Sequence, residues 1–250
     1  MLVVLSPAKR LDETPRPFRT DPIFPDDTAA LVALLRAHDA DGLAALLGLS
    51  PKLAALNHAR YRGWDDARPF PALRLFAGDT YAGLDAATLD ADAGRWAEGR
   101  LRILSGLYGL LRPGDGVRPH RLEMGTRLAT PRGPDLRRFW GDPIARALSD
   151  AAEAAGARWL LDCASAEYGR AVDRAALRVP VVTPVFLEVR PVGPPKVVSF
   201  AAKRARGAMA RFVLETRITD PCDLRAFEAG GYRWRAEGST PDRPVFLRGA

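Results

Sequence analysis

Several short apolar runs in this 250-residue chain end in side chains that can bind a ligand or transfer a proton. In open α/β sheets, ligands bind at the carboxyl ends of the strands, where such residues gather. These residues are Lys9, Asp79, Ser105, Ser165 and Glu167. Glu123, framed by Arg121, can act as an acid or a base, and Lys203 can hold a phosphate together with Lys9. One predicted function is therefore an enzyme that acts on a nucleotide or nucleobase, free or lifted out of DNA, in a cleft lined by Lys9, Glu123 and Lys203.

The segment from Leu47 to Leu56 resembles a helix-hairpin-helix motif, and the whole subregion spans about residues 39–61. Its hydrophobic, glycine and alanine positions fit if Ser50 replaces the second glycine of the motif. Gly48 permits a turn that aims backbone N–H groups outward at a helix start, where the helix dipole favours anions. Lys52 adds a positive charge, and none of these groups reads base identity. The segment predicts sequence-independent contact with DNA phosphates, and the alternative is a hairpin that only packs a helical subdomain.

Basic side chains cluster in further places along the chain. Between Lys196 and Arg211 the sequence has several basic residues and no acidic one, and a second cluster includes Arg102 and Arg121. Clustered cations favour phosphate binding, although each of them can equally lie on a solvated helix face or in an ion pair. The predicted DNA contacts are Gly48, Ser50, Lys52, Arg102, Arg121, Lys203, Arg204 and Arg206.

The elements that must position these residues follow from the apolar pattern. Short apolar runs predict strands at 2–5, 73–76, 101–104, 159–162, 181–186 and 196–200, and a closing hairpin from 232–235 and 245–248. Helical spacing predicts a helix capped by Asp27, the pair of helices around Gly48, and helices at 92–99, 143–155 and 201–216. Because strands alternate with helices, we expect a single compact α/β domain over residues 1–250, with a mixed, partly parallel sheet and flanking helices.

Composition narrows the class of protein. Lys plus Arg exceed Asp plus Glu by 37 to 30, and the net charge of +7 favours polyanionic partners. No apolar run approaches the ~20 residues needed to cross a membrane, and the apolar start is too short for a secretory signal, so we expect a cytoplasmic protein without membrane contact. The cysteines and histidines show no metal-ligand spacing, and we expect no metal and no cofactor. No P-loop, GxGxxG, HExxH or GxSxG motif indicates a known reaction.

Blocks of sequence spread over nearly the whole chain resemble the YaaA peroxide-stress family. The blocks are SPAK at 6–9, GDTYAGL at 78–84, LSGLYGLLRP at 104–113, PHRLEMGTRL at 119–128, FWGD at 139–142, ASAEY at 164–168, PVF at 184–186 and AAKRARGAMARF at 201–212. The chain departs from the family pattern at His120, where we expect Tyr, and at Asp162 and Cys163, where Asn-Leu is usual. The resemblance implies one α/β body, a helix-hairpin-helix element, a positively charged cleft for DNA and a role against iron-driven oxidative damage.

The sequence therefore predicts non-sequence-specific binding of duplex or branched DNA, in the response to hydrogen peroxide and iron-driven oxidative stress. The alternative is the nucleotide or nucleobase enzyme. The two predictions differ in geometry: Lys9, Glu123 and Lys203 meet in one narrow pocket in the enzyme and line an open groove in the DNA-binding protein.

Overall fold

The first strand of the chain forms the centre of the molecule. The computed structural model describes residues 1–249, and its central sheet has the strand order β6-β5-β1-β8-β9. Strand β1 (Leu2–Leu5) runs parallel to β5 (Leu101–Ser105) and β8 (Leu160–Asp162). Strand β9 (Val181–Val182) is parallel to β8, and β6 (Gly109–Leu111) is antiparallel to β5. The carboxyl ends of β1, β5 and β8 therefore share one edge of the sheet.

Both faces of the sheet are covered, which is why β1 is apolar throughout and buried at every position. Leu2 and Val4 join one hydrophobic cluster together with helix α8 (Pro143–Ala154). Val3 and Leu5 join a second cluster, with α6 (Ala91–Arg100) and α10 (Ser199–Thr216). This division follows from the alternation of side chains along a strand.

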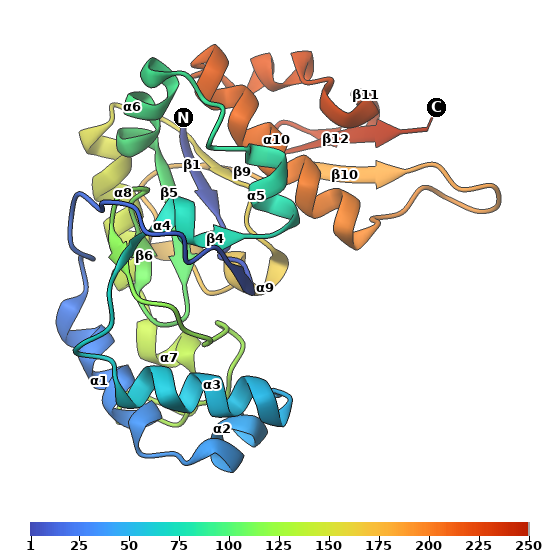
Figure 1. Ribbon diagram of the computed structural model, residues 1–250. Coiled ribbons are helices and arrows are strands. Elements are labelled where there is room, and N and C mark those ends of the chain that lie inside the picture. Colours follow the sequence, from blue (N-terminus) through green and yellow to red (C-terminus); the bar gives the residue numbers. More distant parts are fainter. Residues whose placement is uncertain (250) are drawn as a thin grey trace.

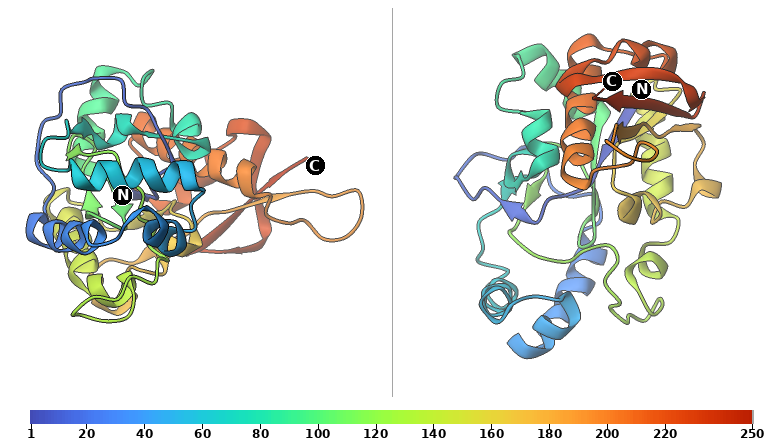
Figure 2. Two further views of the ribbon diagram at one scale, coloured as in Figure 1. Left: turned by 60° about the horizontal axis from the view of Figure 1, so that its bottom comes forward. Right: turned by 90° about the vertical axis from the view of Figure 1, so that its right-hand side faces the viewer.

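Helices α1 (Pro25–Arg36), α2 (Ala40–Leu47) and α3 (Pro51–Arg62) form a lobe at the bottom of Figure 1 and of the right-hand view in Figure 2. The cluster that contains Leu2 and Val4 continues into this lobe. The connection from the lobe to β5 holds the short pieces β3 (Phe70–Pro71), α4 (Ala72–Leu75), β4 (Phe76–Ala77) and α5 (Asp79–Leu84). Strand β4 pairs with β2 (Arg10–Leu11), and β3 pairs with β7 (Gly116–Val117).

The C-terminal part forms a second sheet. Its strand order is β10-β12-β11, from β10 (Val185–Glu188), β12 (Arg243–Arg248) and β11 (Tyr232–Thr240). The aromatic rings of Phe186, Tyr232 and Phe246 pack together between this sheet and α10. The segment between β10 and α10 projects from the body at the right of Figure 1. The remaining elements are α7 (Leu136–Trp140), α9 (Ala166–Gly169) and the 3₁₀ turns Arg174–Ala176, Pro221–Ala226 and Ala229–Gly231.

The mixed, partly parallel α/β fold predicted from the sequence is confirmed, but several element predictions are wrong. Residues 73–76 belong mainly to helix α4, and 196–200 lead into α10 instead of forming a strand. The run 181–186 is divided at Pro184 between strands of two different sheets. Asp27 is no N-cap, since α1 begins at Pro25. Short apolar runs do not distinguish a strand from a buried helical turn, which explains these errors.

Helices α5 and α10 cross without side chains between them. A Cβ atom placed on Gly207 would lie 1.7 Å from the carbonyl oxygen of Thr80, and one on Gly83 would lie 2.0 Å from that of Arg204. Both neighbours are backbone atoms, so they cannot make room by rotating a side chain. The crossing therefore requires glycine on each helix, and it fixes the start of α5 against the basic part of α10.

We expect Gly207→Ala to lower the free energy of unfolding by about 3 kcal/mol, because the added methyl group must push the two helices apart. Gly94→Ala on α6 is the matched control. A Cβ at Gly94 meets nothing within 4 Å, so alanine should stabilise the helix by roughly 0.5–1 kcal/mol. Urea unfolding of both variants measures the two changes. Equal stability of Gly207→Ala and the wild-type protein would contradict the tight crossing.

Candidate functional site

A cavity of about 660 Å³, here named the Lys9 cavity, opens at the carboxyl ends of β1 and β8. Its walls come from the loop after β1 (residues 6–10), the start of α5, Glu123, the loop between β8 and α9, and helix α10. Lys9, Glu123 and Lys203, which the sequence analysis grouped, all line it, and so do Asp79, Ser165, Glu167 and Arg206. Lys9, Ser165 and Glu167, which follow β1 and β8, thus meet in one cavity, whereas Asp79 reaches it from the start of α5 and not from the end of a strand of the central sheet.

Hydrogen bonds hold the Glu123 carboxylate in one orientation. The Tyr168 hydroxyl donates to Oε2 at 3.1 Å, and the Nε–H of Arg121 donates to Oε1 at 3.2 Å. Burial raises the pKa of Tyr168 well above its usual range, so this phenol stays protonated and remains a donor. The carbonyl oxygen of Arg121 in turn accepts a hydrogen bond of 2.9 Å from Tyr61 in α3. The carboxylate is thus attached to both the helical lobe and the sheet edge.

The loops around the cavity are also fixed by polar contacts. The backbone N–H of Ser165 donates to the Ser6 hydroxyl at 2.7 Å, and the Tyr81 hydroxyl donates to the carbonyl oxygen of Ser6 at 3.0 Å. Glu167 accepts a 2.8 Å hydrogen bond from the backbone N–H of Gly125. These bonds join the segments that contain Lys9, Glu123 and Tyr168, so the cavity is shaped before any ligand enters it.

The cations of the cavity are available to a ligand. Lys9 and Lys203 are exposed and Arg206 is half-buried, and the ion pairs formed within residues 1–249 include none of the three. A phosphate can therefore be met without breaking an existing ion pair. Cys163 also lines the cavity, but burial raises the pKa of its thiol, which keeps it protonated and unreactive at neutral pH.

Other predicted site residues lie elsewhere. Ser105 is buried, and its hydroxyl accepts N–H bonds from Leu107 and Tyr108, so it serves the turn after β5. Arg102 is half-buried and donates from Nη1 to the carbonyl oxygens of Glu98 and Leu101. Arg204 lines a different cavity, together with Phe200 and Arg248.

A tight turn joins α2 and α3 at the segment for which the sequence predicts phosphate binding. Gly48 ends α2 with a φ of 60°, in the left-handed region that favours glycine. Ser50 is the N-cap of α3, and its side chain makes no capping hydrogen bond. Lys52 is exposed in the first turn of α3. The turn lies in the helical lobe, whereas Lys203 and Arg206 lie on α10 in the upper body (Figure 1).

Ser6, Arg10 and Tyr168 are cavity residues that the sequence analysis did not assign a role. Ser6 and Tyr168 lie within sequence blocks that carry the family resemblance, which was the available signal. Within residues 1–249, no three His, Cys, Asp or Glu side chains gather at a spacing that could hold a metal ion. In the same part of the chain, no helix is both long and apolar enough to cross a membrane.

The fold and the cavity define an α/β protein with a partly cationic cavity at the carboxyl edge of its sheet. A family profile described as peroxide stress protein YaaA matches residues 1–238. A UPF0246 protein of Cereibacter sphaeroides is 57% identical over 256 residues, covering 99% of each chain. UPF0246 proteins of Ruegeria pomeroyi and Roseobacter denitrificans are 51% and 49% identical, each covering 99% of this chain and 98% of their own. The chain belongs to the YaaA family of peroxide stress proteins, and the family resemblance predicted from the sequence is confirmed.

His120 directly precedes Arg121 in the chain and is buried among aromatic rings. Its ring packs edge-on against Trp64 and Tyr108, and its Nδ1 lies 2.8 Å from the carbonyl oxygen of Arg118. Because a carbonyl oxygen can only accept, the ring carries its proton on Nδ1. Burial lowers the pKa of His120 from 6.5 to about 4, so the ring is neutral near pH 7.

This burial predicts a loss of stability in mild acid. Between pH 6.5 and about 4 the unfolded chain binds a proton at His120 that the folded chain does not, so stability falls as the pH decreases through this window. The expected contribution at pH 5 is about 2 kcal/mol relative to pH 7.5. Urea unfolding at both pH values should show a smaller pH effect in His120→Gln than in the wild-type protein. An identical pH effect in both proteins would contradict the buried neutral ring.

Proposed function

We propose that this protein acts in the cytoplasm during the response to hydrogen peroxide and iron-driven oxidative stress, by binding duplex or branched DNA without reading its sequence. We further propose that one nucleotide of the DNA enters the Lys9 cavity. The proposal joins the two functions that the sequence left open, and each part of it has its own support in the structure.

The observation that carries the nucleotide-binding part of the proposal is the convergence at the Lys9 cavity. Lys9, Glu123 and Lys203 meet in this one cavity, which is the arrangement expected of a site for a nucleotide or nucleobase. The blocks SPAK, GDTYAGL, RLEMG, ASAEY and AAKRARG each contribute lining residues. Segments that carry the family resemblance, although far apart in sequence, thus meet at one place, which supports a functional role for the cavity.

The chemistry of the cavity suits a nucleotide. A volume of about 660 Å³ lies within the usual range for small-ligand sites. Lys9, Lys203 and Arg206 supply charges for a phosphate, while the fixed Glu123 carboxylate can accept hydrogen bonds from a base or take a proton from it. A base inside duplex DNA must leave the stack to reach such a site.

The hairpin supplies the sequence-independent part of the binding. The start of α3 presents backbone N–H groups without a capping side chain, and Lys52 stands beside them. Such a helix start binds phosphate through its N–H groups and the helix dipole. Arg102 and Arg121 do not support this role, because carbonyl oxygens engage the first and Glu123 engages the second.

An enzyme that acts on a free nucleotide is the second candidate function. The fixed Glu123 carboxylate, held between Tyr168 and Arg121, favours it, because a general acid or base must keep a constant orientation. In this case the cavity would bind a free mononucleotide, and its affinity for a nucleotide within DNA would be no higher.

The DNA-binding part is tested by fluorescence anisotropy with linear duplex, single-stranded and four-way-junction DNA across a salt series. We expect Lys52→Glu combined with Lys203→Glu to lose most of the affinity while remaining folded, and to reduce the salt slope on duplex by about 1.8. Arg95→Glu combined with Arg158→Glu is the control of equal charge, because both residues are exposed and lie toward the amino end of the sheet. Equal losses in the two double variants would show that net charge alone determines binding.

The cavity part is tested by calorimetric titration with thymidine monophosphate. We expect Lys203→Glu to weaken binding about tenfold or more, because one cation of the phosphate site is replaced by an anion. Lys52→Glu should leave this affinity unchanged, since Lys52 lies outside the cavity. Binding that is insensitive to Lys203→Glu would place the nucleotide elsewhere.

A further inference from the structure

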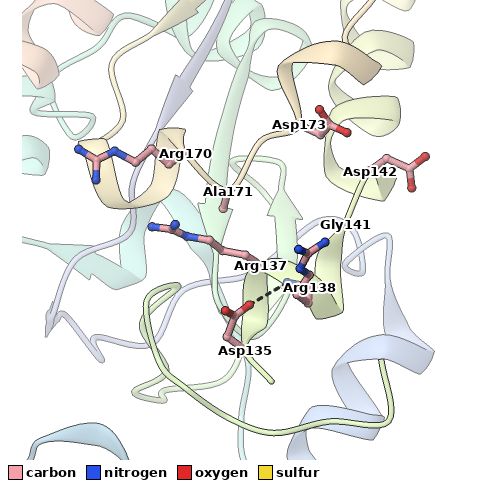
Figure 3. A pocket seen from close by; sticks show the side chains of 8 residues that line it. All are labelled: Asp135, Arg137, Arg138, Gly141, Asp142, Arg170, Ala171 and Asp173. Carbon is pink, nitrogen blue, oxygen red and sulfur yellow. Dashed lines mark hydrogen bonds between the residues drawn. The ribbon is translucent and has the colours of Figure 1, made fainter. Parts of the chain in front are cut away.

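A second cavity of about 690 Å³, here named the Arg137 cavity, lies between α7, the start of α8 and the segment after α9 (Figure 3). Arg137, Arg138 and Arg170 line it, together with Asp135, Asp142 and Asp173. Figure 3 shows the Arg137 and Arg170 side chains extending toward the same side.

The carboxylates of this cavity already have partners. Asp135 accepts the backbone N–H of Arg138, Asp173 accepts that of Ala175, and Asp142 pairs with Arg146. Within residues 1–249, by contrast, the guanidinium groups of Arg137, Arg138 and Arg170 take part in no ion pair or side-chain hydrogen bond. A backbone N–H bond leaves the charge of a carboxylate in place, so Asp135 and Asp173 offset part of the positive charge and the cavity keeps a small net positive charge.

A third cavity of about 570 Å³ lies next to both the Arg137 cavity and the Lys9 cavity. It shares Ser165 and Arg206 with the Lys9 cavity, and it shares Arg170 with the Arg137 cavity. Its carboxylate, Asp162, is buried and pairs with Arg174 at 2.5 Å, while Arg243 adds a further cation. The three cavities thus adjoin one another through shared lining residues, each has basic residues in its lining, and together they are here named the groove.

We infer that this groove binds an unpaired DNA strand, whose phosphates contact Arg206, Arg170 and Arg137 in turn while one nucleotide occupies the Lys9 cavity. The inference rests on the proposed function and adds the second binding site and the form of the ligand. A mononucleotide fills only one of the cavities, whereas a strand carries a phosphate at every residue and matches a row of cations. The strand must be unpaired there because its base enters a cavity.

The test compares thymidine monophosphate with oligothymidylates of increasing length up to twelve nucleotides. For the wild-type protein, affinity should rise with length until the groove is filled. Arg137→Gln combined with Arg170→Gln should bind the monophosphate like the wild-type protein, and should bind the twelve-nucleotide strand about tenfold more weakly, with a salt slope smaller by about 1.4. Arg95→Gln combined with Arg158→Gln removes the same charge outside the groove and should bind both like the wild-type protein.

The outcomes separate this inference from the proposed function. If the wild-type protein binds the monophosphate but its affinity does not rise with the length of the oligothymidylate, the groove inference is wrong and the cavity proposal stands. The groove inference is also wrong if the affinity of the Arg137 and Arg170 double variant rises with oligothymidylate length as much as that of the wild-type protein. If the wild-type protein binds neither the monophosphate nor any strand, the proposed function fails together with the inference.

Discussion

The contact between helices α5 and α10 is the constraint on which the site depends. Because Gly83 and Gly207 bring the two backbones together, the start of α5 and the middle of α10 form adjoining walls of one cavity. Larger residues at either glycine would move Lys203 and Arg206 away from the loop that contains Lys9. The basic residues of α10 thus owe their position to two glycines, Gly207 on the same helix and Gly83 on α5.

A second constraint comes from the sheet. Strand β1 is buried at every position and is flanked by parallel strands. The loops that follow β1 and β8 therefore leave the sheet at the same edge. The Ser6 hydroxyl then links these two exits through its bond with the N–H of Ser165. From there, Tyr168, Glu123, Arg121 and Tyr61 form a continuous set of hydrogen bonds into the helical lobe. A ligand that displaced Glu123 would therefore disturb hydrogen bonds that reach α3 as well as those at the sheet edge.

Sequence reasoning located the cavity because general rules govern strand ends: polar residues after buried strands converge, and Lys9, Ser165 and Glu167 do so. The same reasoning failed where local pattern is ambiguous, as in the helical turn at 72–75, or where Pro184 divides an apolar run between sheets. Ser105 is the last residue of β5 in the same sheet, but its buried hydroxyl binds the turn that follows, which the sequence pattern does not reveal. The FWGD block reaches the Arg137 cavity through Gly141 and Asp142, but the sequence analysis did not assign a role to the arginines of that cavity.

The environment of Cys163 bears on how a peroxide stress protein of this kind can work. Peroxide reacts with thiolates, and reactive cysteines combine exposure with a lowered thiol pKa. Cys163 has neither property, because it is 1% exposed and burial raises the pKa of its thiol. Arg206 favours the thiolate, but desolvation outweighs it and the nearby Asp162 adds to the rise. The thiol therefore packs against the cavity as a small apolar group, and it lacks the exposure and the lowered pKa that reaction with peroxide requires.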